Sequence, residues 1–153
     1  MGNEHAYRLD LEWTGDTALG YRHYGRTHTV RITGKPDLIT TSDPTFLGDP
    51  TIHNPEDLLL AALSSCHLLT YLALCARSRI RVTHYHDTAT GTMITTPDGG
   101  GRFAEVVLHP EVTVADESML AKARELHAAA HKYCFIANSV NFPVRHEAVC
   151  SFV

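Results

Sequence analysis

The longest apolar stretch of this chain follows residues that begin a helix, and it constrains the fold more than any other feature. Asn54 can cap the helix, and Pro55 suits its first turn, where a backbone N–H has no helical partner. Glu56 and Asp57 then place negative charge at the positive end of the helix dipole. We predict a helix from about Pro55 to Arg77. Because its residues are apolar nearly all the way round, most of its faces should be buried.

The length of the chain limits how such a helix can be covered. With 153 residues, the chain is long enough for one globular domain, and we expect a single domain over residues 1–153. Two arrangements remain open: a sheet of the same chain wraps around the helix, or a second subunit covers it. A domain of this length buries roughly 68 to 70% of its unfolded surface, so it needs no disulfide scaffold or structural metal.

Charge and composition exclude several classes of partner. Thirteen basic and seventeen acidic residues give a net charge of -4, which argues against nucleic acid and anionic membranes as partners. The N-terminal residues are charged where a signal peptide needs an apolar core. Ser64, Ser65 and His67 interrupt the apolar stretch, which disfavours a membrane span. We therefore expect a soluble, cytoplasmic protein, in which cysteines are catalytic, metal-binding or buried and not permanently bridged.

Apolar periodicity and turn-forming Gly and Pro residues predict the other elements. Residues 42–53 contain two Asp-Pro pairs and are expected to form a surface loop. The remaining expected elements are strands 7–13, 21–33, 81–95 and 103–114, a helix over 117–132, and a last strand over 144–152. The resulting order, β-β-α-β-β-α-β, is an α+β arrangement of antiparallel hairpins with one central helix.

The cysteines differ in their surroundings. Cys66 lies in a small polar island of the predicted helix, next to Ser65 and His67. A reactive thiol and a buried, unreactive one are both consistent with this position. Cys75 lies nine residues further on, so it is rotated by about 180° around the helix and cannot bridge to Cys66. We expect Cys75, and Cys150 in the alternating last strand, to be core residues.

Cys134 lies at the end of the second predicted helix, at a junction where a helix start can lower a thiol pKa. Its neighbours leave a second interpretation open. His127 and His131 lie one turn apart on one helical face, and with Cys134 they have a spacing that suits a transition metal. No second cluster of cysteine or histidine at a standard metal-site spacing accompanies them. A metal-binding module through these three residues is therefore an alternative.

Two segments resemble the signature motifs of the OsmC/Ohr family of thiol-dependent organic hydroperoxide reductases. In NPEDLLLAALSSCHLLTYL, which starts at Asn54, Asn-Pro-Glu opens a long helix and a cysteine follows ten residues after the glutamate. AHKYCFIANSV, which contains Cys134, resembles the second-cysteine motif of the family. The order of the predicted elements also matches, so the resemblance covers nearly the whole chain. It implies an OsmC-like fold and an intertwined homodimer with two active sites at the subunit interface.

The resemblance also implies a reaction. Cys66 would be the peroxidatic thiolate that attacks the terminal oxygen of an organic hydroperoxide and becomes a sulfenic acid. Cys134 would then condense with it to an intramolecular disulfide and release water. An external thiol or dithiol, such as a dihydrolipoyl protein, would reduce the disulfide. No metal, flavin or haem is implied, and the substrate is expected to be small and apolar, for example a lipid-derived peroxide.

In the family, a glutamate at the helix start and an arginine from the first hairpin support the thiolate. A cation beside sulfur lowers its pKa, and a carboxylate holds the flexible cation in position. The glutamate corresponds to Glu56; for the arginine we prefer Arg22, close to the turn, over Arg26, with Arg31 third. Ten helical residues span about 15 Å, so Glu56 cannot directly neighbour Cys66 of its own chain. Either a second subunit supplies Glu56, or a long arginine spans part of the gap.

We expect an apolar pocket around this small charged centre. The candidate lining residues are His67, Phe46, Leu47, Tyr71 and Phe135. Phe135 stands where the family commonly has a proline and His67 where an aromatic residue is frequent, which puts the substrate range and the resolving rate in doubt. The rival function, from another class, is a non-catalytic member of the family that binds an apolar or thiol-reactive ligand in this pocket.

Overall fold

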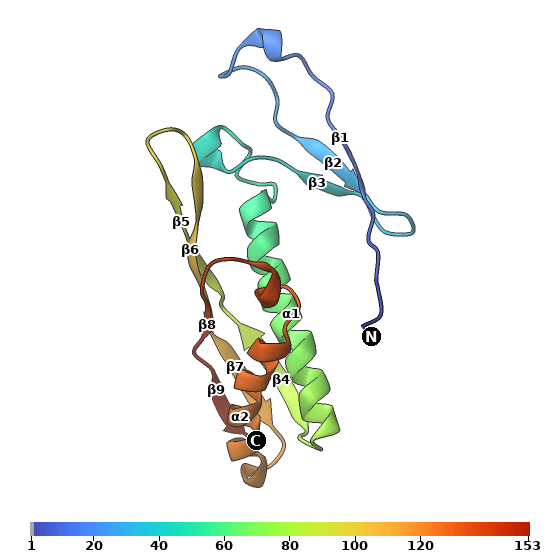
Figure 1. The fold of residues 1–153 in the computed structure, drawn as a ribbon, viewed down its shortest axis with the longest axis vertical. Helices are drawn as coiled ribbons and strands as arrows, with labels where there is room; N and C mark the ends of the chain where they lie inside the picture. The colour runs from blue at the N-terminus through green and yellow to red at the C-terminus, as the bar shows by residue number, and fades with distance from the viewer. Residues whose placement is uncertain (1) are drawn as a thin grey trace. The chain divides into compact units, whose positions relative to one another are not determined.

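The computed structural model describes residues 2–153, and the chain divides into two compact units. The first unit ends at Leu59 and the second spans Leu60–Val153. The boundary falls inside the long helix α1 (Pro55–Arg77), which is continuous across it. The α+β class with one long helix, as expected from the sequence, is confirmed (Figure 1).

The first unit contains a three-stranded antiparallel sheet of β1 (Asp10–Glu12), β2 (His28–Arg31) and β3 (Leu38–Thr40), with β2 in the middle. The predicted pairing of the first two strands is confirmed, since β1 runs antiparallel to β2. Three details of the prediction are wrong. All three β1 residues are exposed, because β1 is the edge strand of a small sheet, whereas a half-buried strand was expected. β3 was missed, and both predicted strands are shorter than expected.

The expected strand over residues 21–33 begins only at His28 because residues 21–27 form a loop. A short 3-10 helix, η1 (Thr17–Leu19), precedes the loop, and Gly20 follows it with a φ of 88°. The Arg26 guanidinium donates hydrogen bonds to the carbonyl oxygens of Tyr21 and Tyr24. These carbonyl groups are therefore used within the loop and not in a strand ladder.

Residues 42–53 form a loop, as predicted, with a 3-10 helix η2 (Pro44–Phe46) inside it. Asp43 caps this helix by accepting a hydrogen bond from the Thr45 N–H at 2.7 Å. Gly48 is required because a Cβ atom at this position would lie 1.5 Å from the Ser42 carbonyl oxygen.

The start of α1 is fixed by a reciprocal pair of hydrogen bonds. The Asn54 side-chain oxygen accepts from the Asp57 N–H at 2.9 Å, and the Asp57 carboxylate accepts from the Asn54 N–H at 3.2 Å. Both bonds satisfy N–H groups that have no partner within the helix. The predicted start at Pro55 and end at Arg77 are both confirmed.

The second unit contains two further three-stranded sheets, with strand orders β4-β7-β9 and β5-β6-β8. Its helices and strands are β4 (Val82–Asp87), β5 (Thr90–Thr95), β6 (Gly101–Leu108), β7 (Pro110–Val114), η3 (Glu117–Met119), α2 (Leu120–Tyr133), η4 (Ala137–Ser139), β8 (Val144–His146) and β9 (Val149–Phe152). As predicted, β5 and β6 form a hairpin across residues 96–100.

Three of the expected strands are each divided into two. The Asp87 carboxylate accepts hydrogen bonds from the His109 N–H, at 2.7 Å, and from the Ser64 hydroxyl, which fixes the turns after β4 and β6 next to one another. The expected last strand is interrupted at Glu147, whose N–H donates to the Leu108 carbonyl at 2.8 Å. The predicted antiparallel hairpins are therefore joined by two parallel pairs that were not predicted, β8 with β6 and β9 with β7.

The core of the second unit lies between α1, α2 and the β4-β7-β9 sheet. α1 contributes one buried face, and the Tyr71 hydroxyl donates to the Ala123 carbonyl of α2 at 3.0 Å. Cys75 and Cys150 both belong to this core, as predicted. The buried members of the core are Tyr71, Cys75, Val112, Val114, Ala123, Leu126, Ala130 and Cys150.

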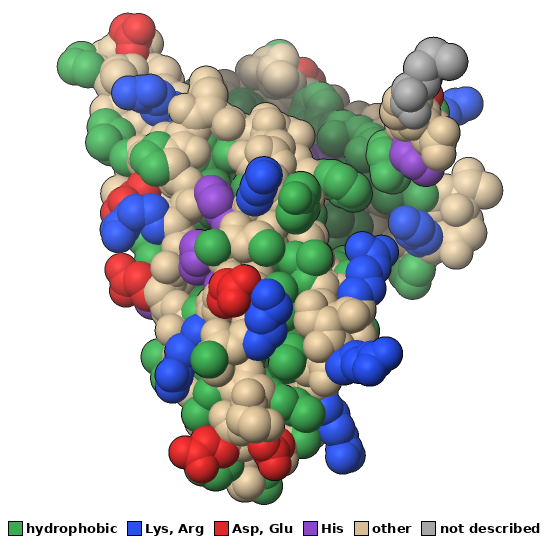
Figure 2. All heavy atoms as spheres, turned by 60° about the horizontal axis from the view of Figure 1, so that its bottom comes forward, with side chains coloured by type: hydrophobic (Ala, Val, Ile, Leu, Met, Phe, Trp, Pro, Cys, Tyr) green, Lys and Arg blue, Asp and Glu red, His purple; other side chains and the backbone are tan. Residues whose placement is uncertain are grey.

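The remaining faces of α1 are less covered than its composition requires. By length and apolar composition alone, α1 is long enough to cross a membrane, yet only 22% of its most apolar 18-residue stretch is buried. Leu69 is 64% exposed and Leu72 is 36% exposed. Hydrophobic side chains also appear on the surface of the molecule among lysines and arginines (Figure 2). The expectation of a helix buried on most faces is therefore not met by this chain alone.

Candidate active site

Cys66 lies on the partly covered side of α1, next to a cavity of about 750 Å³ in the second unit. The cavity is formed by one face of α1 and by the segment that follows α2. The lining residues are Ala62, Ser65, Cys66, Leu69, Thr70, Ala73, Leu74, Arg77, Tyr133, Phe135 and Ile136. Most of these side chains are apolar, so the thiol faces a mainly apolar space that is open to solvent.

The surroundings of Cys66 lower the pKa of its thiol. Partial burial acts in the opposite direction, but hydrogen bonding from the Ile136 backbone, the Cys134 thiol and the Phe135 backbone outweighs it, with a smaller contribution from the Thr70 hydroxyl. Hydrogen bonds to a thiolate stabilise its charge. The thiolate is the nucleophilic form of cysteine, so a lowered pKa favours a nucleophilic role for Cys66.

Cys134 ends α2 and is buried, with 1% of its surface exposed. Its carbonyl oxygen accepts hydrogen bonds from the backbone N–H of Asn138, at 3.1 Å, and from the Asn138 side chain, at 3.0 Å. Burial, together with the neighbouring Cys66, raises the pKa of the Cys134 thiol to about 11. The two thiol pKa values are thus shifted in opposite directions, downward for Cys66 and upward for Cys134. All four cysteines of the chain are free thiols.

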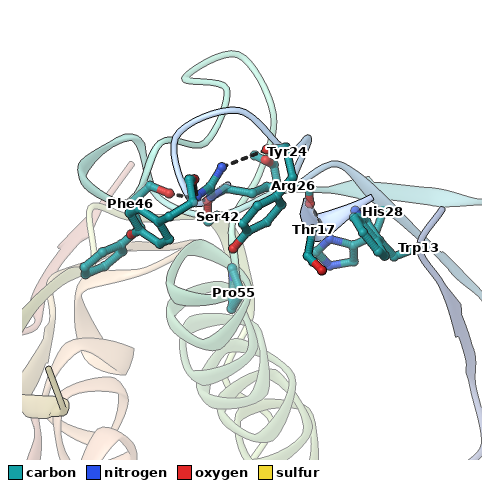
Figure 3. A pocket seen from close by; sticks show the side chains of 10 residues that line it. Trp13, Thr17, Tyr24, Arg26, His28, Ser42, Phe46 and Pro55 are labelled. Atoms are coloured by element: carbon teal, nitrogen blue, oxygen red, sulfur yellow. Dashed lines mark hydrogen bonds between the residues drawn. The ribbon is translucent and has the colours of Figure 1, made fainter. Parts of the chain in front are cut away.

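The first unit contains a separate cavity of about 540 Å³, lined by Arg26, Phe46, Pro55 and several aromatic residues (Figure 3). The Arg26 guanidinium carbon lies 4.1 Å from the ring centre of Tyr24 and 4.9 Å from that of Tyr21. Its Nη1 also donates to the Tyr24 carbonyl oxygen at 2.8 Å. Two aromatic faces and two carbonyl groups therefore hold this cation at the cavity wall.

The three candidate arginines lie in different surroundings. Arg26 is half-buried and lines the cavity of the first unit, whereas Arg22 is exposed and does not line it. Arg31 is exposed and forms ion pairs with Glu12, at 2.7 Å, and Asp37, at 3.3 Å. Of the three, only Arg26 lies next to the start of α1, since it shares its cavity with Pro55.

Glu56 follows Pro55 in the first turn of α1. Glu56 is half-buried, and its Oε2 atom is buried without a hydrogen-bond partner among residues 2–153. A buried carboxylate oxygen without a partner is unfavourable. The position therefore suits a cation, although no side chain among residues 2–153 bonds to this oxygen.

The candidate pocket residues fall into three groups. Phe135 is 80% exposed and lines the cavity at Cys66, while Phe46 lines the cavity of the first unit. Leu47 is exposed and lines neither of these cavities. His67 and Tyr71 are buried on the opposite side of α1, in contact with His127 of α2.

The proposed metal ligands are not arranged around one point. His127 is buried, and its Nδ1 lies 3.1 Å from Nε2 of His67, within hydrogen-bonding distance. Among residues 2–153, no group of three or more His, Cys, Asp or Glu side chains has the geometry to hold a metal ion. The metal-binding alternative through His127, His131 and Cys134 therefore has no structural support.

Several residues at the Cys66 cavity were not anticipated from the sequence, among them Thr70 and Arg77. The helical period would have identified them, because Thr70, Ala73 and Arg77 lie four, seven and eleven residues after Cys66, on the same side of the helix. The backbone N–H groups of Phe135 and Ile136 carry no such signal, since their direction depends on the turn after α2.

Comparison with known proteins gives one matching family model, described as OsmC-like protein, over residues 48–148. No curated protein matches the chain. Among solved structures, an OsmC-like protein of unknown function from Vibrio cholerae has 30% sequence identity and a TM-score of 0.84, and the match covers 95% of this chain and 100% of that one.

Two further solved structures are similar in fold. An organic hydroperoxide resistance protein OsmC from Legionella pneumophila has 22% identity and a TM-score of 0.69, with 98% of this chain and 100% of that one covered. An organic hydroperoxide resistance protein from Elizabethkingia anophelis has 19% identity and a TM-score of 0.68, with 99% and 100% covered. At these identities the similarity shows the fold alone.

Proposed function

The chain belongs to the OsmC-like family, and on that basis we propose that it is a thiol-dependent peroxidase that reduces organic hydroperoxides to alcohols. The observation that carries the proposal is the Cys66–Cys134 pair, in which the two thiol pKa values are shifted in opposite directions. The names of two solved relatives, both organic hydroperoxide resistance proteins, agree with it.

In the first step the Cys66 thiolate attacks the terminal oxygen of the hydroperoxide. The S–O bond forms as the O–O bond breaks, and the sulfur is oxidised to a sulfenic acid while the peroxide is reduced by two electrons. The departing alkoxide takes a proton and leaves as the alcohol. The apolar lining of the cavity favours a hydroperoxide with an apolar substituent over hydrogen peroxide.

In the second step Cys134 closes the oxidised intermediate. Its sulfur attacks the Cys66 sulfenic acid, a disulfide forms, and the hydroxyl group leaves with a proton as water. The raised pKa of Cys134 keeps this thiol protonated until the sulfenic acid is present. An external dithiol, with a dihydrolipoyl protein as one candidate, then reduces the disulfide by thiol–disulfide exchange. No metal, flavin or haem takes part, and this reducing cycle suits the cytoplasm.

A cation is needed at the reacting oxygen atoms, because negative charge develops on the departing alkoxide. We assign this role to Arg26, in place of the earlier preference for Arg22, because Arg26 lines a cavity with Pro55 at the start of α1. Glu56, with its buried and unpartnered oxygen, is the carboxylate that would orient the guanidinium.

The active protein is proposed to be a homodimer. α1 is one continuous helix, so Glu56 lies about 15 Å from Cys66 along its axis. Glu56 therefore cannot support the Cys66 thiolate of its own chain. A second copy would bring its own Arg26 and Glu56 to Cys66. It would also cover the exposed apolar surface of α1 at Leu72, which does not line the Cys66 cavity.

The direct test is steady-state turnover with cumene hydroperoxide and with hydrogen peroxide, using dihydrolipoamide as the reductant. We expect kcat/KM for cumene hydroperoxide to exceed that for hydrogen peroxide by at least about a hundredfold, the scale of a bound apolar group of this size. The Cys66→Ser variant should have no activity, and Cys75→Ser should retain it. An inactive wild-type protein that still binds apolar ligands would support the non-catalytic alternative and reject this proposal.

A further inference from the structure

We propose that the side chains of Asn138 and Ser139 are positioning groups for the thiolate of Cys66. They hold the turn after α2 so that two of its backbone N–H groups, those of Phe135 and Ile136, point at the Cys66 sulfur. This inference rests on the proposed function, because it concerns the thiolate that would attack the peroxide. All the residues involved belong to the second unit.

The Asn138 amide binds two carbonyl groups at the end of α2. Its Nδ2 donates to the Lys132 oxygen at 2.9 Å and to the Cys134 oxygen at 3.0 Å. Carbonyl groups at the end of a helix have no partner within the helix. The amide nitrogen has two hydrogen atoms, so Asn138 satisfies both acceptors at once. The backbone N–H of Asn138 also donates to the Cys134 oxygen, at 3.1 Å.

Ser139 binds the next carbonyl group of the turn. Its hydroxyl donates to the Phe135 oxygen at 2.7 Å, and its backbone N–H donates to the Ile136 oxygen at 3.0 Å. Three successive carbonyl groups, those of residues 134, 135 and 136, are therefore held by Asn138 and Ser139.

The N–H groups of the same peptides are left for the sulfur. No carbonyl oxygen among residues 2–153 accepts a hydrogen bond from the N–H of Phe135 or Ile136. Both groups instead bond to Cys66, which lines one cavity together with these two residues. Donors of this kind stabilise a thiolate only when they are directed at it.

The planarity of the peptide group connects these two observations. In a planar trans peptide, the N–H points away from the carbonyl group of the preceding residue. The bond from Asn138 to the Cys134 oxygen therefore sets the direction of the Phe135 N–H. In the same way, the bond from the Ser139 hydroxyl to the Phe135 oxygen sets the direction of the Ile136 N–H.

Both side chains can be changed without disturbing the core or the cavity. Asn138 and Ser139 are exposed, and neither lines the Cys66 cavity. Truncation of an exposed side chain leaves no hole in the core, so the variants should fold. Their effect on Cys66 should then come from the direction of the two N–H groups.

The test is a pH titration of the ultraviolet absorbance of the thiolate, recorded as the difference between each protein and its Cys66→Ser counterpart. In the double variant Asn138→Ala, Ser139→Ala, the midpoint should rise by at least about one pH unit, because the thiolate loses well-directed donors. Each single variant should show a smaller rise, since one side chain still holds its peptide group.

Conservative variants separate positioning from a structural role. Ser139→Thr keeps the hydroxyl and should retain the wild-type midpoint, and Asn138→Gln should reverse part of the rise seen in Asn138→Ala. Asn141→Ala removes an exposed amide from the same connection and should have no effect. A double variant with a lowered melting temperature and an unchanged midpoint overturns the inference, as does an equal rise in Asn141→Ala.

The titration needs no peroxide, so its result is independent of the peroxidase proposal. A raised midpoint in a protein without turnover supports the positioning role and rejects the peroxidase. If the protein is a peroxidase, kcat/KM for cumene hydroperoxide should be about threefold to tenfold lower in the double variant at pH values below both midpoints. The thiolate fraction falls about tenfold per pH unit, while the nucleophilicity of the thiolate rises with its pKa. The loss should disappear above both midpoints, and an equal loss at every pH overturns the inference.

Discussion

Nε2 of His67 on α1 lies 3.1 Å from Nδ1 of His127 on α2, and both rings are 99% shielded from solvent. His146 lies close to both, with ring centres 5.6 Å from His67 and 6.1 Å from His127, and the Cys150 sulfur lies 3.9 Å from Nε2 of His127. Burial, together with the neighbouring histidines, lowers the pKa of His67 to about 4 and that of His127 to about 3. The pair is thus built to stay neutral in the folded protein.

This pair should make the folded protein sensitive to mild acid. In the unfolded chain each ring binds a proton below about pH 6.5, whereas in the folded protein both remain neutral down to about pH 4. The unfolded state therefore binds more protons, and the free energy of unfolding falls as the pH is lowered from about 6.5 to 4, by up to about 1.4 kcal/mol per pH unit for each histidine. Urea unfolding at a series of pH values measures this slope.

Two variants test whether the buried histidine pair causes the pH dependence of the free energy of unfolding. His127→Gln removes one titrating ring from the buried pair, so its slope should be shallower than that of the wild type. His84→Gln removes an exposed histidine and should leave the slope unchanged. An equal slope in wild type and His127→Gln would mean that the buried pair does not control the acid response.

The assignment of Arg26 predicts a difference between two neighbouring arginines. Arg26→Gln removes the cation proposed to stabilise the departing alkoxide and should lower kcat/KM for cumene hydroperoxide about a hundredfold, as loss of one preorganised charge donor does. Arg22→Gln removes an exposed charge and should lower it by less than twofold. A larger loss in the Arg22 variant would restore Arg22, the arginine preferred from the sequence, as the residue that acts.

If the protein is a homodimer through the exposed side of α1, a charged side chain placed on that side should weaken the dimer. Leu72→Glu places a carboxylate on that side without altering the lining of the Cys66 cavity, and it should shift the dimer toward monomer in sedimentation equilibrium. Ile94→Glu, at an exposed position of β5, is the control and should remain dimeric. A wild-type protein that is monomeric at micromolar concentration would contradict the shared active site.

The features that follow from local rules were predictable from the sequence. The helix from Pro55 to Arg77 was predictable because its signals are local. The capping pair lies within its first turn, and the apolar stretch runs along the helix itself. The opposite directions of Cys66 and Cys75 follow from the helical period alone. The core positions of Cys75 and Cys150 follow from their apolar neighbours.

The features that depend on distant contacts were not predictable in this way. The loop over residues 21–27 replaces a strand because Arg26 binds carbonyl groups within it. The division of the longer strands depends on Asp87, which bonds to His109 and Ser64 at sequence separations of 22 and 23 residues. His67 follows Cys66 in the sequence, yet it is buried against His127 and does not line the Cys66 cavity. This burial could not be predicted locally, because His127 lies 60 residues away in the sequence.

The roles of Cys66 and Cys134 are tested most directly by the number of free thiols per chain before and after one equivalent of cumene hydroperoxide. If Cys66 and Cys134 form a peroxidatic and resolving pair, two of the four thiols should disappear, and peptide mapping should show a disulfide between these two residues. The Cys134→Ser variant should instead lose one thiol and trap a sulfenic acid at Cys66. If all four thiols remain after exposure to the peroxide, or if the disulfide joins Cys75 and Cys150, Cys66 and Cys134 are not a peroxidatic and resolving pair.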